Sequence, residues 1–401
     1  MHEAFSYNLR HLRALSAIAT HGTMSAAADA IGLSQPALAQ GLAKLEQQFG
    51  TPLFVREPAG MKPTPEGRLV TARALAALTR LAAAMRSLPR GRLRGFERAE
   101  HRLTSTQIRA LLSLAEGGSF LGAARATGTS QPALHRAVRE LEGLCGVALC
   151  ERRGQRVGLT DQGAKLARQF RLASADLLAA RQDLAVSEGE GRIVIGAMPL
   201  CRALLLPRAI ARMTRAHPDF RFDVAEGSYT ELIEPLRDGR MEIAIGALRE
   251  PCPPDLREEA LFVDSLAIAA RKQHPLAREG RIDRERLAQF PWIIGRAGSP
   301  LREHWERLFD GEHPPAPIEC GSVMAIRGVL LESDFLTLLS PDQIALELES
   351  GMLTTLETTL PDAQRTIGVI SRADWLPTLL QRRFLDLLKA LGSGRDTPEI
   401  E

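Results

Sequence analysis

The amino-terminal half of this chain contains one segment twice. Residues 8–68 align without a gap with residues 104–164, and 21 of the 61 aligned positions are identical. Identity is highest where residues 32–38 (GLSQPAL) match residues 128–134 (GTSQPAL). An internal repeat of this kind marks one structural module that is used twice, so the fold of this half must accommodate two copies of it.

Each copy has the pattern of two short helices joined by a tight turn. In the first copy, residues 25–31 are small and suit a helix, and Gly32 follows where a positive φ commonly ends one. Ser34 suits the N-cap of the next helix, with Pro36 tolerated in its first turn. The second copy repeats this pattern ninety-six residues later. The module is therefore predicted to be a helix-turn-helix, whose second helix enters the major groove of DNA.

A basic, hairpin-like stretch follows the second helix of each copy. It is interpreted as a wing that holds phosphates, which position a protein on DNA without specifying sequence. The predicted DNA-binding residues of the first copy are Ser34, Gln35, Pro36, Gln40, Lys44, Arg56 and Lys62. Those of the second copy are Ser130, Gln131, Pro132, His135, Arg136, Arg139, Arg152, Arg153 and Arg156.

The two copies differ at the positions that would read DNA. The first reading helix carries Gln40, and Gly41 weakens it by about 1 kcal/mol relative to Ala. The second carries Arg136 and Arg139, and Arg is the commonest ligand of base edges. We expect the second copy to be the stronger reader and the first to assist it. The alternative is that one copy serves only as a packing module.

Charge is divided unequally along the chain. The net charge is +3, but residues 1–188 hold 25 Lys and Arg against 15 Asp and Glu, while residues 189–401 hold 26 against 33. A basic half joined to an acidic half suggests that only the first half meets a polyanion. Two Ala- and Leu-rich stretches, residues 65–88 and 161–186, are predicted to be long amphipathic helices. The basic connector at residues 87–98 is either a solvated hinge or a DNA contact.

The carboxy-terminal half, from Gly191, alternates predicted strands and helices. Strands at residues 192–197, 220–225 and 241–247 alternate with helices at residues 202–216 and 229–238. Alternation of this kind favours an α/β fold with a mostly parallel sheet covered by helices. A second unit of the same type follows, and residues 365–371 and 376–391 are predicted to return to the first sheet.

The chain resembles the LysR-type bacterial transcriptional regulators. In each copy the resemblance rests on the paired alanines, the SQPAL string, Leu-Glu, and a final Thr-x-x-Gly; in the second half it rests on strings such as IAIG at residues 243–246 and HPLA at residues 274–277. It implies a winged helix-turn-helix, a linker helix that pairs between subunits, and a two-lobed, periplasmic-binding-protein-like effector domain. The family usually has one DNA module. With two linker helices here, one is expected to pair between subunits and the other to pack within the chain.

These expectations divide the chain into five parts. They are a first winged helix-turn-helix (1–67), a helical linker and connector (68–100), a second winged helix-turn-helix (101–165), a linker helix (166–190) and an effector domain (191–395). Lobe I of that domain covers about 191–262 and 363–392, and lobe II about 263–362. The expected partners are operator DNA, a small-molecule effector such as an organic acid, and further copies of the chain in a dimer or tetramer.

The effector is expected at the carboxyl ends of strands, near helix N-termini. The candidate residues are Cys201, Arg202, Ser228, Tyr229, Leu248, Ser299, Ser322 and Val323. Arg202 either pairs with a carboxylate of the ligand or is a solvated surface residue. Ser299 and Ser322 also suit N-caps without a ligand role, and Leu248 and Val323 also suit the core.

Other functions have less support in the sequence. A thiol-based redox sensor would use Cys201, or Cys145 with Cys150, and would need a thiol of lowered pKa. No catalytic motif such as HExxH or GxSxG is present, so no enzyme activity and no cofactor are expected. The cysteines lack zinc-type spacing, so no metal is expected either. Without an apolar stretch at its start or a membrane-length run, the chain is expected to be cytoplasmic.

Overall fold

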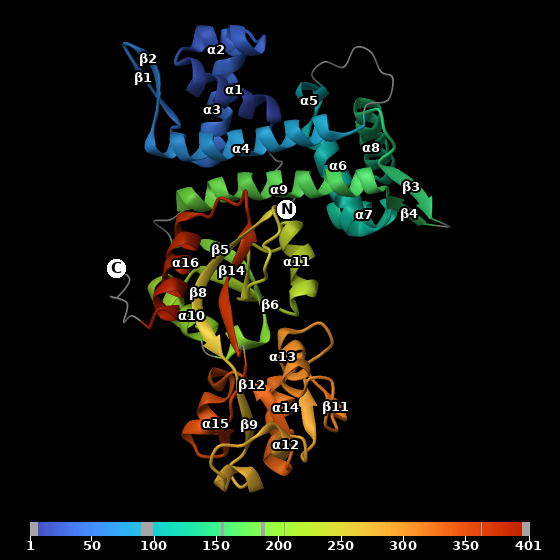
Figure 1. Cartoon of the computed structure of the whole chain (residues 1–401). Helices are drawn as coiled ribbons and strands as arrows, with labels where there is room; N and C mark the ends of the chain where they lie inside the picture. The colour runs from blue at the N-terminus through green and yellow to red at the C-terminus, as the bar shows by residue number, and fades with distance from the viewer. Residues whose placement is uncertain are drawn as a thin grey trace. The chain divides into compact units, whose positions relative to one another are not determined.

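The computed structural model describes residues 7–89, 99–153, 156–185, 189–203, 205–361 and 363–394 (Figure 1). The chain divides into two compact units. The first contains residues up to Glu190 together with the short segment Leu376–Leu379, and the second contains the remainder from Gly191. Most of the predicted connector, residues 90–98, lies outside the described residues.

The first unit contains both copies of the repeat, each with three helices, a two-stranded hairpin and a long helix. The first copy consists of α1 (Leu9–His21), α2 (Met24–Ile31), α3 (Gln35–Phe49), β1 (Phe54–Glu57), β2 (Gly60–Pro63) and α4 (Pro65–Ser87). After the short α5 (Ala99–Arg102), the second consists of α6 (Ser105–Gly117), α7 (Phe120–Thr127), α8 (Gln131–Cys145), β3 (Cys150–Arg153), β4 (Arg156–Leu159) and α9 (Asp161–Leu184).

Capping residues set the helix bounds in both copies. Ser34 caps α3, and its side chain accepts from the backbone N–H of Ala37; Ser130 does the same for α8. Gly32 ends α2 with a φ of 66°, and Gly128 ends α7 with the same value. These conformations suit glycine, which has no Cβ to clash. The predicted helix-turn-helix pattern is therefore present in both copies.

The long helices α4 and α9 pack against each other within the chain (Figure 1). They run antiparallel, because Arg73 of α4 pairs with Asp183 of α9 while Arg80 pairs with Asp176. Their apolar faces join one hydrophobic core that includes buried residues of both copies. The linker helices thus pack against each other within the chain, as was expected for one of them.

The second unit has two five-stranded sheets, each forming a lobe with its helices. In chain order its elements are β5 (Gly191–Ala197), α10 (Leu205–Ala216), β6 (Phe220–Glu226), α11 (Tyr229–Arg237), β7 (Ile243–Ala247), β8 (Leu256–Ser265), β9 (Ala267–Arg271), α12 (Arg284–Leu287), β10 (Trp292–Ile294), α13 (Pro300–Phe309), β11 (Ile318–Glu319), α14 (Val323–Glu332), β12 (Leu336–Leu339), α15 (Ala345–Glu349), β13 (Leu353–Leu356), β14 (Gln364–Arg372) and α16 (Leu379–Gly392).

Both sheets are mixed, which corrects the expectation of a mostly parallel sheet. The first has the order β6-β5-β7-β14-β8, with parallel pairs around β5 and antiparallel pairs around β14. The second has the order β11-β10-β12-β9-β13, and β9 pairs antiparallel with both of its neighbours. The chain crosses from the first sheet to the second after β8 and returns before β14. Two strands that the sequence pattern did not reveal, β8 and β13, account for part of the difference.

None of the described helices is both long and apolar enough to span a bilayer.

Candidate nucleic-acid interface and effector site

The second helix of each helix-turn-helix buries one face and exposes the other. In α3 the buried face includes Leu38, Leu42 and Leu45. The predicted residues Gln35, Pro36, Gln40 and Lys44 are exposed, as are Gln131, Pro132, His135 and Arg136 on α8. Because the packed face fixes each helix, the exposed face is available to a major groove.

The exposed end of α8 forms a shallow hollow. Gln131, Pro132, His135 and Arg136 line it, and its volume is about 510 Å³. The His135 ring lies 5.0 Å from the ring of Phe120 between centroids, which restricts its orientation. Arg139, further along, pairs at 3.3 Å with Glu142 of the same helix, although its side chain is 70% exposed. Arg139 therefore has a partner on its own helix, whereas His135 and Arg136 line the hollow.

The hairpins place basic side chains beside the reading helices. Arg56 lies exposed on β1, and Lys62, on β2, pairs at 3.1 Å with Glu57 in a largely solvated contact. Arg152 is exposed on β3. Arg153 and Arg156 face each other in the backbone register of β3 and β4, and their side chains lie outside the described residues. These positions suit contacts with phosphates.

One further residue of each copy ties the wing to the reading helix, and sequence reasoning did not assign it this role. The Glu46 carboxylate accepts the backbone N–H groups of Leu53 and Phe54 at 2.8 and 3.3 Å. Glu142 accepts those of Leu149 and Cys150 at 2.9 and 3.1 Å. The sequence does contain a sign of this role, because the Leu-Glu pair that ends in Glu46 or Glu142 occurs in both copies. A carboxylate that accepts two N–H groups fixes where the strand begins, and so where the wing lies.

Gly41 of α3 has a packing role. A Cβ at this position would lie 3.1 Å from Cδ2 of the His11 ring on α1, so the glycine allows these two helices to approach closely. Burial, with a smaller contribution from the charge of Lys44, lowers the pKa of His11. The second copy has Ala137 at the matching position, and Gln107 stands at the position that matches His11. The expected cost of Gly41 to helix stability is thus offset in part by contact between helices.

Cys201 and Arg202, two of the predicted effector residues, have different surroundings. Cys201 is 1% exposed, and Arg202 ends the short 3₁₀ turn Pro199–Arg202 and does not begin α10. The Arg202 guanidinium forms an ion pair with Glu226 of the same unit. The sequence left open whether Arg202 binds a ligand carboxylate or is solvated at the surface. In the structure it has an internal partner, Glu226, which a ligand carboxylate would have to displace.

The remaining candidates occupy helix starts or apolar surroundings. Ser228, Ser299 and Ser322 are the N-caps of α11, α13 and α14, as the sequence suggested for Ser299 and Ser322. Tyr229 lies under the guanidinium of Arg249, 5.2 Å from ring centroid to Cζ. Leu248 packs against the cluster that contains Met198, and Val323 is the first residue of α14.

A buried polar cluster near Cys201 was not found from sequence. The Asp264 carboxylate accepts from Ser340 Oγ at 2.6 Å and from Arg365 Nε at 2.7 Å. Arg365 Nη2 is buried and has no hydrogen-bond partner among the described residues. Burial raises the pKa of Cys201 to about 12, and the charges of Arg365 and Asp264 also act on it, so the thiol lies beside this cluster. An unpaired, buried guanidinium nitrogen is suited to an anionic or carbonyl ligand.

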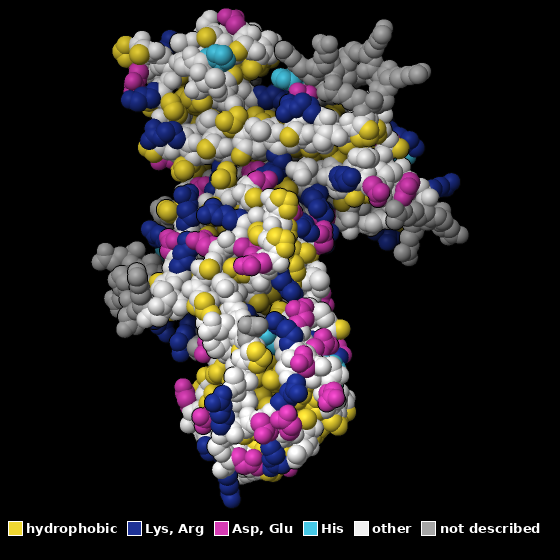
Figure 2. Space-filling view, in the orientation of Figure 1, with side chains coloured by type: hydrophobic (Ala, Val, Ile, Leu, Met, Phe, Trp, Pro, Cys, Tyr) yellow, Lys and Arg dark blue, Asp and Glu magenta, His cyan; other side chains and the backbone are white. Residues whose placement is uncertain are grey.

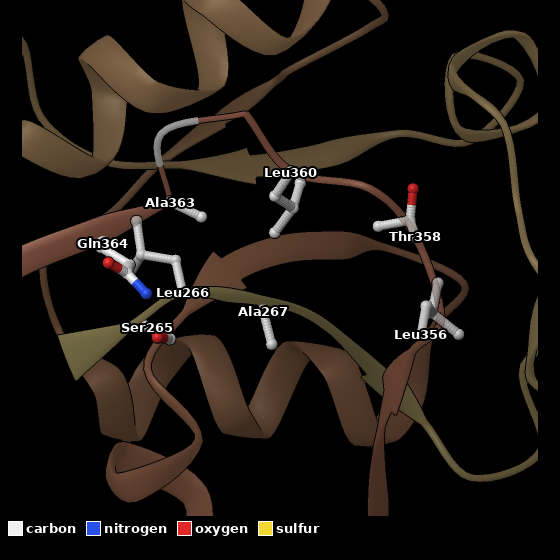
Figure 3. A pocket seen from close by; sticks show the side chains of 8 residues that line it. All are labelled: Ser265, Leu266, Ala267, Leu356, Thr358, Leu360, Ala363 and Gln364. Carbon is white, nitrogen blue, oxygen red and sulfur yellow. The ribbon is translucent and has the colours of Figure 1, made fainter.

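A cavity of about 590 Å³ lies where the chain crosses between the two sheets. Its lining comes from the crossing after β8, with Ser265, Leu266 and Ala267, and from the return to β14, with Leu360, Ala363 and Gln364 (Figure 3). None of the predicted effector residues lines it. Among the described residues, no group of three or more His, Cys, Asp or Glu side chains could hold a metal ion.

Surface charge separates the two candidate regions. Half of the predicted DNA residues are Lys or Arg and none is Asp or Glu. The lobe that contains α12, α13 and α15 instead shows Lys and Arg interspersed with Asp and Glu on the face seen in Figure 2. An interspersed surface does not concentrate potential of one sign, as a DNA-binding face must.

Family models match most of the chain. The model "Bacterial regulatory helix-turn-helix protein, lysR family" matches residues 9–68 and again residues 105–164. The model "LysR substrate binding domain" matches residues 187–393. The chain belongs to the LysR family. It is a DNA-binding transcriptional regulator with an effector-binding domain, as the repeated module and the two-lobed unit indicated.

Two relatives differ in how much of the chain they match. The HTH-type transcriptional regulator GalR of Pseudomonas putida is 32% identical over 377 residues, covering 92% of this chain and 93% of that protein. The SDS degradation transcriptional activation protein of Pseudomonas sp. is 33% identical over 276 residues, covering 67% and 89%. A match over 92% of the chain includes most of both copies of the repeat.

A solved structure has the same fold. A full-length OxyR variant from Pseudomonas aeruginosa is 22% identical to this chain, with a TM-score of 0.53, and the match covers 72% of this chain and 93% of that one.

Proposed function

We propose that this regulator reads DNA mainly through α8 and uses α3 as an assisting reader. The observation that carries the proposal is the exposed group His135 and Arg136 at the start of α8, where α3 has Ala39 and Gln40. Arg offers two parallel donors to guanine, whereas Gln and Ala do not. Glu142 fixes the wing beside this group, so base and phosphate contacts act together.

The test is binding of the full chain to a DNA fragment enriched from a random-sequence pool. The double variant Arg136→Ala/Arg139→Ala should lose at least tenfold in affinity, since one good base contact contributes about 1–3 kcal/mol. The matched control, Gln40→Ala/Lys44→Ala, should lose less. A larger loss in the control would assign the main reading role to α3. Affinity of the native chain should also fall steeply with added salt.

We propose that the effector is a small organic acid held between the lobes, beside Cys201 and Arg202. The buried, unpaired Nη2 of Arg365 supports this, because it gives a carboxylate a charged partner inside the unit. Carboxylic acids would be screened by the rise in Tm that binding produces. An acid that stabilises the native chain and not Arg202→Gln would support the site, whereas equal stabilisation of both would exclude Arg202 from it.

The proposal also covers catalytic activity and oligomeric state. The chain acts as a regulator without turnover of the effector, and it associates into a homo-oligomer as LysR regulators do. Membership of the family supports both. Recovery of the acid unchanged after prolonged incubation, and a solution mass that is a multiple of the chain mass, are the expected results. A converted acid would indicate an enzyme, and a chain mass that persists at high concentration would exclude the oligomer.

A further inference from the structure

The two linker helices meet at equivalent positions of the repeat. Asp176 stands ninety-six residues after Arg80, which is the offset between the two copies. Arg80 Nε donates to Asp176 Oδ2 at 3.2 Å, and the two side chains are only 13% and 11% exposed. Two antiparallel helices bring equivalent positions together only where a local two-fold axis crosses them. The first unit therefore resembles a symmetric dimer made from one chain, with its axis at this ion pair.

The charges at this axis distinguish one pairing from the others. If α4 paired with α4 of a second chain in the same register, Arg80 would face another Arg80. If α9 paired with α9, Asp176 would face another Asp176. Like charges held together away from water repel strongly, whereas the observed pair attracts. The charge pattern thus favours α4 with α9 over either pairing of identical helices.

A second ion pair also has its Arg on α4 and its Asp on α9. Arg73 Nη2 lies 2.8 Å from Asp183 Oδ2, and both side chains are almost fully buried. The positions related to this pair by the local axis hold Gln169 and Ser87, which carry no charge. A pairing of α4 with α4 would place Arg73 opposite Ser87 and leave its charge unpaired. Removing one partner of a buried ion pair is costly, so this contact also selects α4 with α9.

The pairing has a consequence for DNA. A dimer of identical readers needs two identical, inverted half-sites. Here the local axis relates α3 to α8, and their exposed residues differ: Ala39, Gln40 and Ala43 on one, His135, Arg136 and Arg139 on the other. We propose that one chain, through the α4–α9 pairing that Arg80 and Asp176 specify, reads an inverted DNA site whose two half-sites have different sequences. This rests on the proposed reading role of α3 and α8.

The pairing is tested by charge exchange in the full chain. Arg80→Asp and Asp176→Arg should each lower the Tm by about 5 °C, and the double variant should regain most of the loss. If α4 paired with α4, the double variant would show no recovery, and that result would overturn the proposal. Arg80→Gln, Asp176→Asn and their combination supply a milder cycle if a reversed charge prevents folding, with the same expectation of positive coupling.

A matched control is the exposed pair of Lys62 and Glu57, which lies on the same unit at 3.1 Å with side chains 63% and 43% exposed. Lys62→Asp should change the Tm by less than about 2 °C, because solvated pairs contribute little. A fall equal to that of Arg80→Asp would show that any charge reversal destabilises this unit, and would remove the support for a specific pairing.

The DNA consequence is tested by enrichment from a random-sequence pool. The native chain should select two unlike half-sites. The variant Ala39→His/Gln40→Arg/Ala43→Arg, which gives α3 the exposed residues of α8, should select an inverted repeat with matching half-sites. Selection of matching half-sites by the native chain, or of the same unlike half-sites by the variant, would overturn this inference and leave the proposed DNA reading intact. Failure to select any sequence would overturn the proposed DNA reading and the inference with it.

Discussion

At the scale of single residues, two glycines explain why the Thr-x-x-Gly string occurs in both copies. A Cβ on Gly67 would lie 1.8 Å from the carbonyl oxygen of Leu53, and one on Gly163 would lie 2.1 Å from that of Leu149. Backbone atoms of the wing cannot move aside as a flexible side chain can. Gly67→Ala or Gly163→Ala should therefore destabilise the first unit by about 1–3 kcal/mol, measured by thermal unfolding.

Gly143 supplies the control for this prediction. It lies in α8, and no atom other than its chain neighbours and the backbone of its own helix lies within 4 Å of the point that an added Cβ would occupy. Gly143→Ala should therefore leave the unit as stable or stabilise it by up to about 1 kcal/mol. Destabilisation equal to that of Gly163→Ala would indicate that the unit tolerates no added methyl group at either glycine, and the explanation from wing contact would fail.

Cysteine reactivity is a second prediction for single residues. Burial raises the pKa of Cys145 and of Cys201 to about 12, and that of Cys150 to about 11. Thiolates react and thiols do not, so these buried groups should resist iodoacetamide at about pH 8 in the folded chain. Cys252 should be labelled first because it is exposed, although desolvation and the charge of Glu258 also raise its pKa. Peptide mass analysis before and after denaturation measures this. Rapid labelling of Cys201 in the folded chain would revive the redox alternative, which its burial opposes.

At the scale of elements, the wings depend on one carboxylate each. Glu46→Gln and Glu142→Gln retain the shape of the side chain but replace a charged acceptor with a neutral one, which weakens two hydrogen bonds to the strand. Each change should loosen its hairpin, seen as faster hydrogen exchange at Leu53 or Leu149. Because α8 is proposed as the main reader, Glu142→Gln should reduce DNA affinity more than Glu46→Gln. The reverse order would favour the first copy.

The elements also show how far sequence patterns extend. The helix-turn-helix bounds followed from capping residues and glycines, which act locally and are legible in the sequence. The pairing of α4 with α9 could not be read in this way, because an apolar stripe fits many partner helices. The ion pairs Arg80–Asp176 and Arg73–Asp183, whose members are far apart in sequence, distinguish this pairing from the others. Strand β8 was missed because it pairs on one side only and carries charged residues such as Glu258 and Glu259 among its apolar ones. Arg365 and Asp264 became a site candidate only when folding brought them beside Cys201.

At the scale of the whole molecule, Asp264 links the two lobes of the effector unit. It lies on β8 in the first sheet, pairs with Arg365 on β14, and accepts from Ser340, which follows β12 in the second sheet. Its side chain is 4% exposed and that of Arg365 is 12% exposed. The contact therefore restrains one lobe against the other at the point where the chain crosses between them.

Asp264→Asn retains an acceptor for Ser340 but leaves the buried charge of Arg365 without its counterion. Breaking a buried pair in this way costs about 3–5 kcal/mol, so the Tm of the effector unit should fall and amide exchange near Ser340 should accelerate. Asp223→Asn, which breaks the exposed pair of Asp223 with Arg192, should cost less than about 1 kcal/mol. If both variants behaved alike, Asp264 would not be a restraint between lobes. A ligand shifts an equilibrium between two arrangements of the lobes only if it binds one arrangement better than the other. If Asp264→Asn altered the response to an effector and Asp223→Asn did not, the ligand would act on the lobes at the crossing point.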